Sequence, residues 1–128
     1  MNRKEIKSLL QKSVHAFKVA EILLSQGFPA DAVSKIYYAL FYAAQALLKN
    51  AKIEVTKHSA VESSLGFHFV RSGIIDQKYH RFYIKVRKLR EIADYHTQEN
   101  IIYPEAAAIL KEAKEFYKLV KQILKKNL

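Results

Sequence analysis

Apolar residues recur every three or four positions along most of the chain, the spacing that places side chains on one face of an α-helix. Five segments follow it: residues 2–26, 30–50, 57–70, 75–95 and 103–128. No stretch alternates apolar and polar residues convincingly, as a half-buried strand does. Between the first two, "QGFPAD" contains the turn residues Gly27 and Pro29. The pattern predicts an all-α protein, an antiparallel bundle of four to five helices with short connections.

Segment 30–50 is apolar around nearly its whole circumference. Between Asp31 and Lys49 its only charged residue is Lys35. Such a helix lies either at the centre of a bundle or against another subunit. Because the chain is short, we expect part of this helix to contact a second copy, and we predict a homodimer.

Segment 75–95 has the most regular pattern of the five. Its apolar residues follow alternating spacings of four and three, which predicts a core-facing seam: Ile75, Tyr79, Phe82, Val86, Leu89 and Ala93. No linker, repeat or low-complexity segment interrupts the chain, so we expect one domain over residues 1–128.

Composition narrows the classes of protein further. The chain of 128 residues has no cysteine, which excludes disulfides, thiolate metal sites and cysteine nucleophiles. No apolar run approaches the roughly 20 residues needed to cross a bilayer, and the N-terminus lacks the apolar core of a signal peptide. We therefore expect a cytoplasmic protein without membrane segments.

The formal net charge of +10 favours an anionic partner, such as nucleic acid. At 100° per residue, one side of segment 75–95 carries basic residues spaced three, four and three: Lys78, Arg81, Lys85 and Lys88. This basic stripe is either an RNA-binding surface that follows phosphates or a solvated helix face. For the charge as a whole, simple solubility is the other explanation.

The stretch "KVRKLREIADYH" concentrates residue types that bind phosphates and transfer protons. Arg90 and Asp94 are four residues apart and can touch, on the side of the helix that also carries Tyr83 and Arg87. The alternatives are a structural ion pair and, for His96, a helix cap or surface residue. No convincing metal cluster accompanies them, because the histidines are dispersed among the segments: His15, His58, His68, His80 and His96.

Four stretches in order, "SKIYYALFYAAQALL", "TKHSAV", "FVRSG" and "RKLREIADY", resemble the HEPN domain, specifically its small stand-alone proteins with an RxxADY signature. The resemblance spans nearly the whole chain. It implies a helical bundle, usually dimeric, in a family with many RNA-cleaving members that use no metal or other cofactor. Those nucleases carry an arginine followed, after four to six residues, by a histidine, and Arg90 and His96 match that spacing.

The resemblance implies that Arg90 binds the phosphate and that His96 is the acid and base. Asp94 would orient one of them, Tyr95 would shape the pocket or hold the helix end, and Arg87 would support the site. Residues six apart on a helix point about 120° away from each other, so we expect the two catalytic residues to meet across a dimer. The implied function is a metal-independent endoribonuclease, the toxin of a pair whose antitoxin is a minimal nucleotidyltransferase.

Two positions differ from the toxin pattern. Glu91 follows the arginine where toxins commonly carry a small polar residue, and Gln98 stands where they often carry a tyrosine. One alternative is therefore a non-catalytic HEPN module that binds a nucleotide, an RNA or a nucleotidyltransferase partner. Another is a helical oligomerisation domain in which Arg90 and Asp94 only brace the bundle.

A histidine and three tyrosines lie outside the implied catalytic set. His58, at the start of a predicted helix, is interpreted as a cap or an interhelical hydrogen-bonding residue, with nucleotide binding as the alternative. Tyr37, Tyr38 and Tyr42 are interpreted as packing residues whose hydroxyls find polar partners, with base stacking as the alternative.

Overall fold

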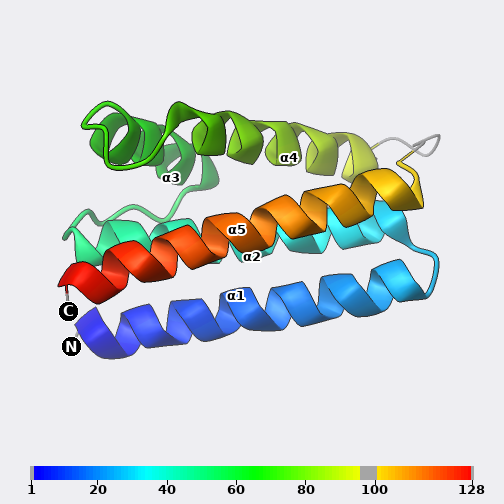
Figure 1. Ribbon diagram of the computed structural model, residues 1–128, viewed down its shortest axis with the longest axis horizontal. Helices are drawn as coiled ribbons and strands as arrows, with labels where there is room; N and C mark the ends of the chain where they lie inside the picture. Colours follow the sequence, from blue (N-terminus) through cyan, green and yellow to red (C-terminus); the bar gives the residue numbers. More distant parts are fainter. Residues whose placement is uncertain (1, 96–100, 128) are drawn as a thin grey trace.

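The computed structural model describes residues 2–95 and 101–127. Within them lie five α-helices, one π-helical turn and no strand (Figure 1), which confirms the all-α prediction. The helices are α1 (Asn2–Ser25), α2 (Pro29–Asn50), α3 (His58–Leu65), α4 (Gln77–Tyr95) and α5 (Tyr103–Asn127), and the π-helical turn Gly66–Val70 continues α3. In the part of the chain just described, no helix is both long and apolar enough to cross a membrane.

Helix α2 is the central element of the bundle. It contacts α1, α3, α4 and α5, and 12 of its 22 residues are buried. In Figure 1, α1 lies along one side of α2 and α4 along the other, while α5 crosses in front. Packing within one chain therefore accounts for most of the apolar circumference of this helix.

The seam predicted on α4 faces the core. Phe82 and Val86 are buried, and the other seam residues on the helix are half-buried: Tyr79, Leu89 and Ala93. Tyr83, which the sequence places beside the seam, is also fully buried, with its ring packed edge-on against Tyr37 of α2. The buried face of α4 is therefore wider than predicted, because the large ring of Tyr83 fills space between α4 and its neighbours.

The turn between α1 and α2 fixes how these two helices pair. Gly27 has a φ of 88°, and Phe28 N–H donates to the Leu23 carbonyl, which satisfies one of the free carbonyls at the end of α1. Pro29 then occupies the first turn of α2, where its fixed φ suits a helix and no amide donor is needed. Both residues act as the sequence predicts.

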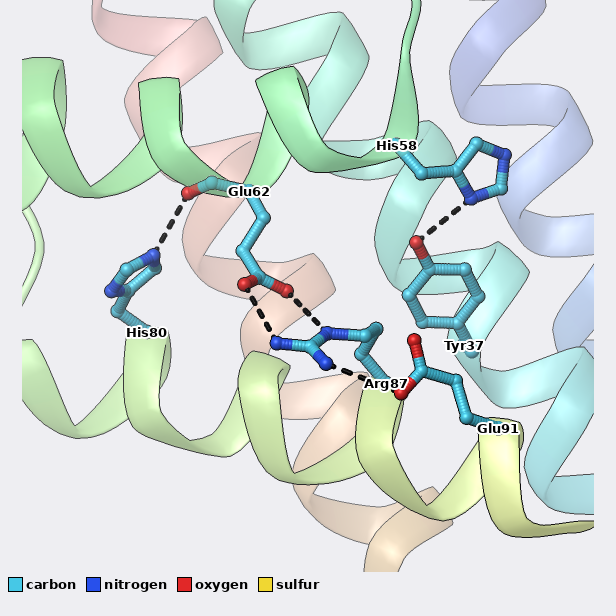
Figure 2. A network of polar contacts seen from close by, with 6 residues as sticks. All are labelled: Tyr37, His58, Glu62, His80, Arg87 and Glu91. Carbon is cyan, nitrogen blue, oxygen red and sulfur yellow. Dashed lines mark hydrogen bonds and ion pairs between the residues drawn. The ribbon is translucent and has the colours of Figure 1, made fainter.

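A close approach between Gly66 and His80 fixes α3 against α4. A Cβ atom at Gly66 would lie 2.7 Å from Cε1 of the His80 ring. The His80 Nε2–H donates to the Glu62 carbonyl at 2.8 Å, so the ring is held where it is (Figure 2). This junction sets the position of α3, which begins with His58.

We predict that Gly66→Ala destabilises the protein by about 1–3 kcal/mol, because the new methyl group displaces the His80 ring from its hydrogen bond. In a His80→Ala background, the same substitution should instead raise the free energy of unfolding. Alanine then gains up to about 1 kcal/mol over glycine from its helix propensity. Urea unfolding of the two single variants and the double variant measures both values. Equal effects in both backgrounds would contradict the close approach.

Candidate functional site

Arg90 is held where α4 crosses α2. Its Nη2–H donates to the Tyr38 hydroxyl at 3.0 Å, and its guanidinium carbon lies 5.2 and 5.1 Å from the ring centroids of Tyr37 and Tyr38. A cation over an aromatic face is attracted by the electron density of the ring. The side chain of Arg90 retains 20% exposure, so it is fixed by α2 but still reached by solvent.

Asp94 extends this network. Its Oδ2 lies 3.0 Å from Arg90 Nε, the ion pair expected from the four-residue spacing. Its Oδ1 accepts a hydrogen bond of 2.7 Å from the Ser34 hydroxyl. Asp94 therefore connects α4 to α2 and orients the guanidinium, an arrangement that would serve either a phosphate clamp or a structural brace.

His58 lies beside the same pair of tyrosines. Its Nδ1 is 2.9 Å from the Tyr37 hydroxyl (Figure 2), and its ring stacks on Phe41 with centroids 4.1 Å apart. The cap residue of α3 is Lys57, so the cap interpretation of His58 is wrong and the interhelical hydrogen bond is confirmed. Burial and the nearby charge of Arg90 lower the pKa of His58, which favours the neutral form of its imidazole.

Arg87 is engaged by two carboxylates. Its Nε and Nη2 donate to Glu62 at 3.0 and 3.1 Å, and its Nη1 donates to Glu91 at 3.2 Å (Figure 2). The paired carboxylates raise the pKa of Arg87 above its ordinary value. Arg87 thus supports the junction of α3 with α4, and Glu91 faces a cation within its own chain.

These residues surround a pocket of about 350 Å³, which lies in the size range of small-ligand sites. It is lined by two arginines, one imidazole, one phenol, one hydroxyl and two carboxylates: Arg87, Arg90, His58, Tyr37, Ser59, Glu62 and Glu91. The pocket therefore combines a fixed cation with a neutral imidazole, the pair of groups that phosphate chemistry uses.

The basic stripe lies elsewhere on α4. Its four residues are exposed, and none forms an ion pair within residues 2–95 and 101–127: Lys78, Arg81, Lys85 and Lys88. At 100° per residue they lie about 120–200° around the helix from Arg90. The stripe is consequently an exposed surface separate from the pocket.

Of the predicted site residues, the structure brings Arg90, Asp94 and Arg87 to one end of α4. Tyr95 is the last residue of that helix, and His96 lies outside the described residues. Sequence reasoning did not place His58 or Tyr38 beside Arg90. A signal was present, because partly buried tyrosine hydroxyls need polar partners, but their identity depends on how helices pair.

In the described part of the chain, no three His, Asp or Glu side chains gather where they could hold a metal ion. Within the pocket lining, Arg87 pairs with Glu62 and Glu91, and His58 pairs with Tyr37.

Comparison with known proteins agrees with this architecture. The model of the HEPN domain matches residues 6–123. A Methanocaldococcus jannaschii protein named "Putative toxin MJ0605" is 36% identical over 98% of this chain and 93% of its own length. A second from that organism, "Putative toxin MJ0142", is 29% identical over 98% of this chain and 86% of its own. A Thermotoga maritima "UPF0332 protein" is 33% identical over 74% of each chain.

The family match covers almost every described helix, including the tyrosines of α2, the start of α3 and the arginines of α4. The bundle and its α2–α4 site thus lie inside the matched region. This chain belongs to the HEPN domain family.

Proposed function

We propose that this chain is a metal-independent endoribonuclease that acts as the toxin of a toxin–antitoxin pair. The family membership and the relatives named as toxins support a HEPN toxin-like role. The net charge of +10 suits an RNA substrate. The observation that carries the proposal is the fixed guanidinium of Arg90 at an open pocket that also contains the imidazole of His58.

The proposed reaction is attack of a ribose 2′-oxygen on the adjacent phosphorus. A base takes the 2′-hydroxyl proton, the bond from phosphorus to the 5′-oxygen breaks, and an acid protonates that oxygen. Arg90 binds the phosphate oxygens and stabilises their developing negative charge. The products are a 2′,3′-cyclic phosphate and a 5′-hydroxyl, so no water is consumed in this step.

Two imidazoles are candidates for the proton transfers. His96 of a second subunit is the acid and base in a homodimer that joins two motifs at one cleft. His58 is the imidazole that shares a pocket with Arg90 in the same chain. Asp94 orients Arg90, and Arg87 supports α3. The role proposed for Tyr95 is either to shape the pocket or to hold the helix end.

Outside the pocket, the basic stripe of α4 binds phosphates farther along the RNA. The proposed substrate is cytoplasmic RNA. The proposed antitoxin is a minimal nucleotidyltransferase that blocks the site, and an acidic surface on this partner would match the net charge of +10 on this chain.

The second candidate function is a non-catalytic module that binds a nucleotide, an RNA or that partner in the same pocket. The observation favouring it is the pair of carboxylates in the lining, Glu62 and Glu91, which share the single guanidinium of Arg87. Negative charge beside the pocket disfavours the extra charge that a phosphate gains during cleavage more than it disfavours a bound phosphate. In this alternative Arg90 positions a ligand without cleavage.

The test incubates purified protein with total RNA in EDTA, alongside His96→Ala and His58→Asn. We expect the wild-type chain to sediment as a dimer and to cleave RNA despite chelation. Loss of cleavage in one histidine variant only would identify the imidazole that transfers the proton. Tight RNA binding without cleavage would support the binding module, and neither activity would leave a structural bundle.

A further inference from the structure

A groove between α1 and α2 adjoins the Arg90 site. It has a volume of about 590 Å³, and its α2 wall is formed by the residues of one helix face: Lys35, Tyr38 and Tyr42. The facing wall, on α1, includes Ser8, Lys12 and His15, which are again spaced four and three apart. Each helix therefore contributes one stripe to a groove that runs along the helix axes.

Tyr38 connects this groove to the candidate cleavage site. Its side chain lines the groove, while its hydroxyl accepts the hydrogen bond from Arg90 and its ring lies under the guanidinium. An RNA strand whose phosphate is bound by Arg90 can therefore continue over Tyr38 into the groove without crossing another helix.

Charge distinguishes this groove from its continuation. Its lining contains Lys12, Lys35 and His15 but no carboxylate, and neither lysine forms an ion pair among the described residues. Beyond Tyr42 the groove continues into a second hollow, where Lys49 is paired with Glu5 at 2.6 Å and with Glu54 at 3.5 Å. Lys12 stands at the boundary and lines both hollows, whereas Lys35 lines only the first, so the first hollow has unpaired lysines and no carboxylate while the second has two carboxylates.

Tyr42 gives the groove an aromatic wall. Its ring is half-buried, with the Lys12 ammonium 5.8 Å from the ring centroid. Proteins that bind single-stranded nucleic acid combine such cations, which follow the phosphates, with aromatic rings on which unpaired bases stack. A double helix cannot offer its base faces to the ring, so an RNA bound here must be single-stranded.

We propose that the α1–α2 groove binds the single-stranded RNA that flanks the phosphate at Arg90, with a base on Tyr42 and phosphates at Lys12 and Lys35. From Ser8 to Val19 the α1 wall spans about 16 Å at 1.5 Å per residue, which accommodates a few nucleotides. The inference rests on the proposed function in so far as Arg90 marks the cleavage point. It assigns the RNA path to α1 and α2 in addition to the stripe on α4.

The test measures binding of a short single-stranded RNA by fluorescence anisotropy, in EDTA, with every 2′-hydroxyl methylated so that cleavage is impossible. Tyr42→Leu should weaken binding about 5- to 150-fold, because one stacked base is lost, whereas Tyr42→Phe should bind like wild type. Lys12→Gln with Lys35→Gln should reduce the slope of log affinity against log salt by about 1.4, since two phosphate contacts disappear.

The matched control is Lys111→Gln with Lys118→Gln, which makes the same charge change at the groove between α1 and α5. This double variant should bind the methylated RNA with an affinity within about twofold of the wild-type value. Equal weakening by both lysine pairs would overturn the proposal in favour of bulk charge. A change in sedimentation but not in RNA affinity for Tyr42→Leu would overturn it in favour of a second copy on this face.

Failure of the cleavage proposal is seen separately, as intact unmodified RNA with wild-type protein. The groove can still be judged in that case, because the methylated RNA reports binding alone. If wild type cleaves RNA and the Tyr42→Leu and lysine variants bind as it does, the groove proposal fails and the cleavage proposal stands.

Discussion

Replacing Arg90 with alanine is expected to reduce RNA cleavage about 10²- to 10³-fold. This is the usual cost of removing one fixed donor that stabilises transition-state charge. The loss should fall on kcat more than on KM, since the guanidinium binds the phosphate most strongly as its charge develops. Arg90→Lys should reduce the cleavage rate less than Arg90→Ala does, because lysine keeps the positive charge but not the forked pair of donors. Single-turnover cleavage of a defined RNA measures both variants.

The control for this prediction is Arg71→Ala, an exposed arginine on the turn after α3 that packs over Phe67. It removes the same charge at a distance from the pocket, so its cleavage rate should match wild type. Circular dichroism melting shows whether Arg90→Ala is folded, which matters because Asp94 loses its ion-pair partner. A folded Arg90→Ala protein with the wild-type rate would restrict Arg90 to bracing α4 on α2.

Phe116→Ala is expected to lower the free energy of unfolding by about 3–5 kcal/mol, the typical cost of removing a fully buried phenylalanine ring. Phe116 of α5 has no exposed surface, and its ring centroid lies 6.3 Å from those of Tyr79 and Tyr83 on α4. Domains of this kind are stable by only about 5–15 kcal/mol, so a large share would be lost. Urea denaturation at constant temperature measures the change.

The matched control is Phe28→Ala, since Phe28 is 52% exposed in the turn between α1 and α2. An exposed side chain leaves no cavity when it is truncated, so its cost should stay within about 0.5 kcal/mol. Similar losses in the two variants would indicate that burial of the Phe116 ring does not carry a large share of the stability of the core.

The helices were predictable because their signal is local. Apolar spacing and turn residues such as Gly27 and Pro29 are encoded within a few positions, and the five predicted segments agree with the structure to within two residues wherever it describes them. The predicted ion pair of Arg90 with Asp94 formed for the same reason, since both residues lie on one helix.

The contacts that build the pocket could not be predicted in this way. Arg90 and Tyr38 are 52 residues apart in the sequence, Arg87 and Glu62 are 25 apart, and Tyr37 and His58 are 21 apart. Periodicity shows which face of each helix is apolar but does not show which faces meet. For that reason the sequence left the cap and hydrogen-bonding interpretations of His58 both open, and it did not predict the ion pair of Arg87 with Glu62.

The same contacts can position a catalyst or simply join helices. Tyr38, Asp94 and Ser34 hold Arg90 between α2 and α4, as a brace requires, and they also fix the guanidinium at the pocket. Preorganisation of this kind is what makes a charged donor effective on a transition state. The two roles differ only in what happens to RNA.

Analysis of the ends of the RNA fragments formed in EDTA tests the cleavage mechanism most directly. Attack by the 2′-oxygen predicts fragments with 2′,3′-cyclic phosphate and 5′-hydroxyl ends from wild-type protein, and none above background from Arg90→Ala. Fragments with 3′-hydroxyl and 5′-phosphate ends, or fragments formed only when a divalent metal is added, would contradict the account.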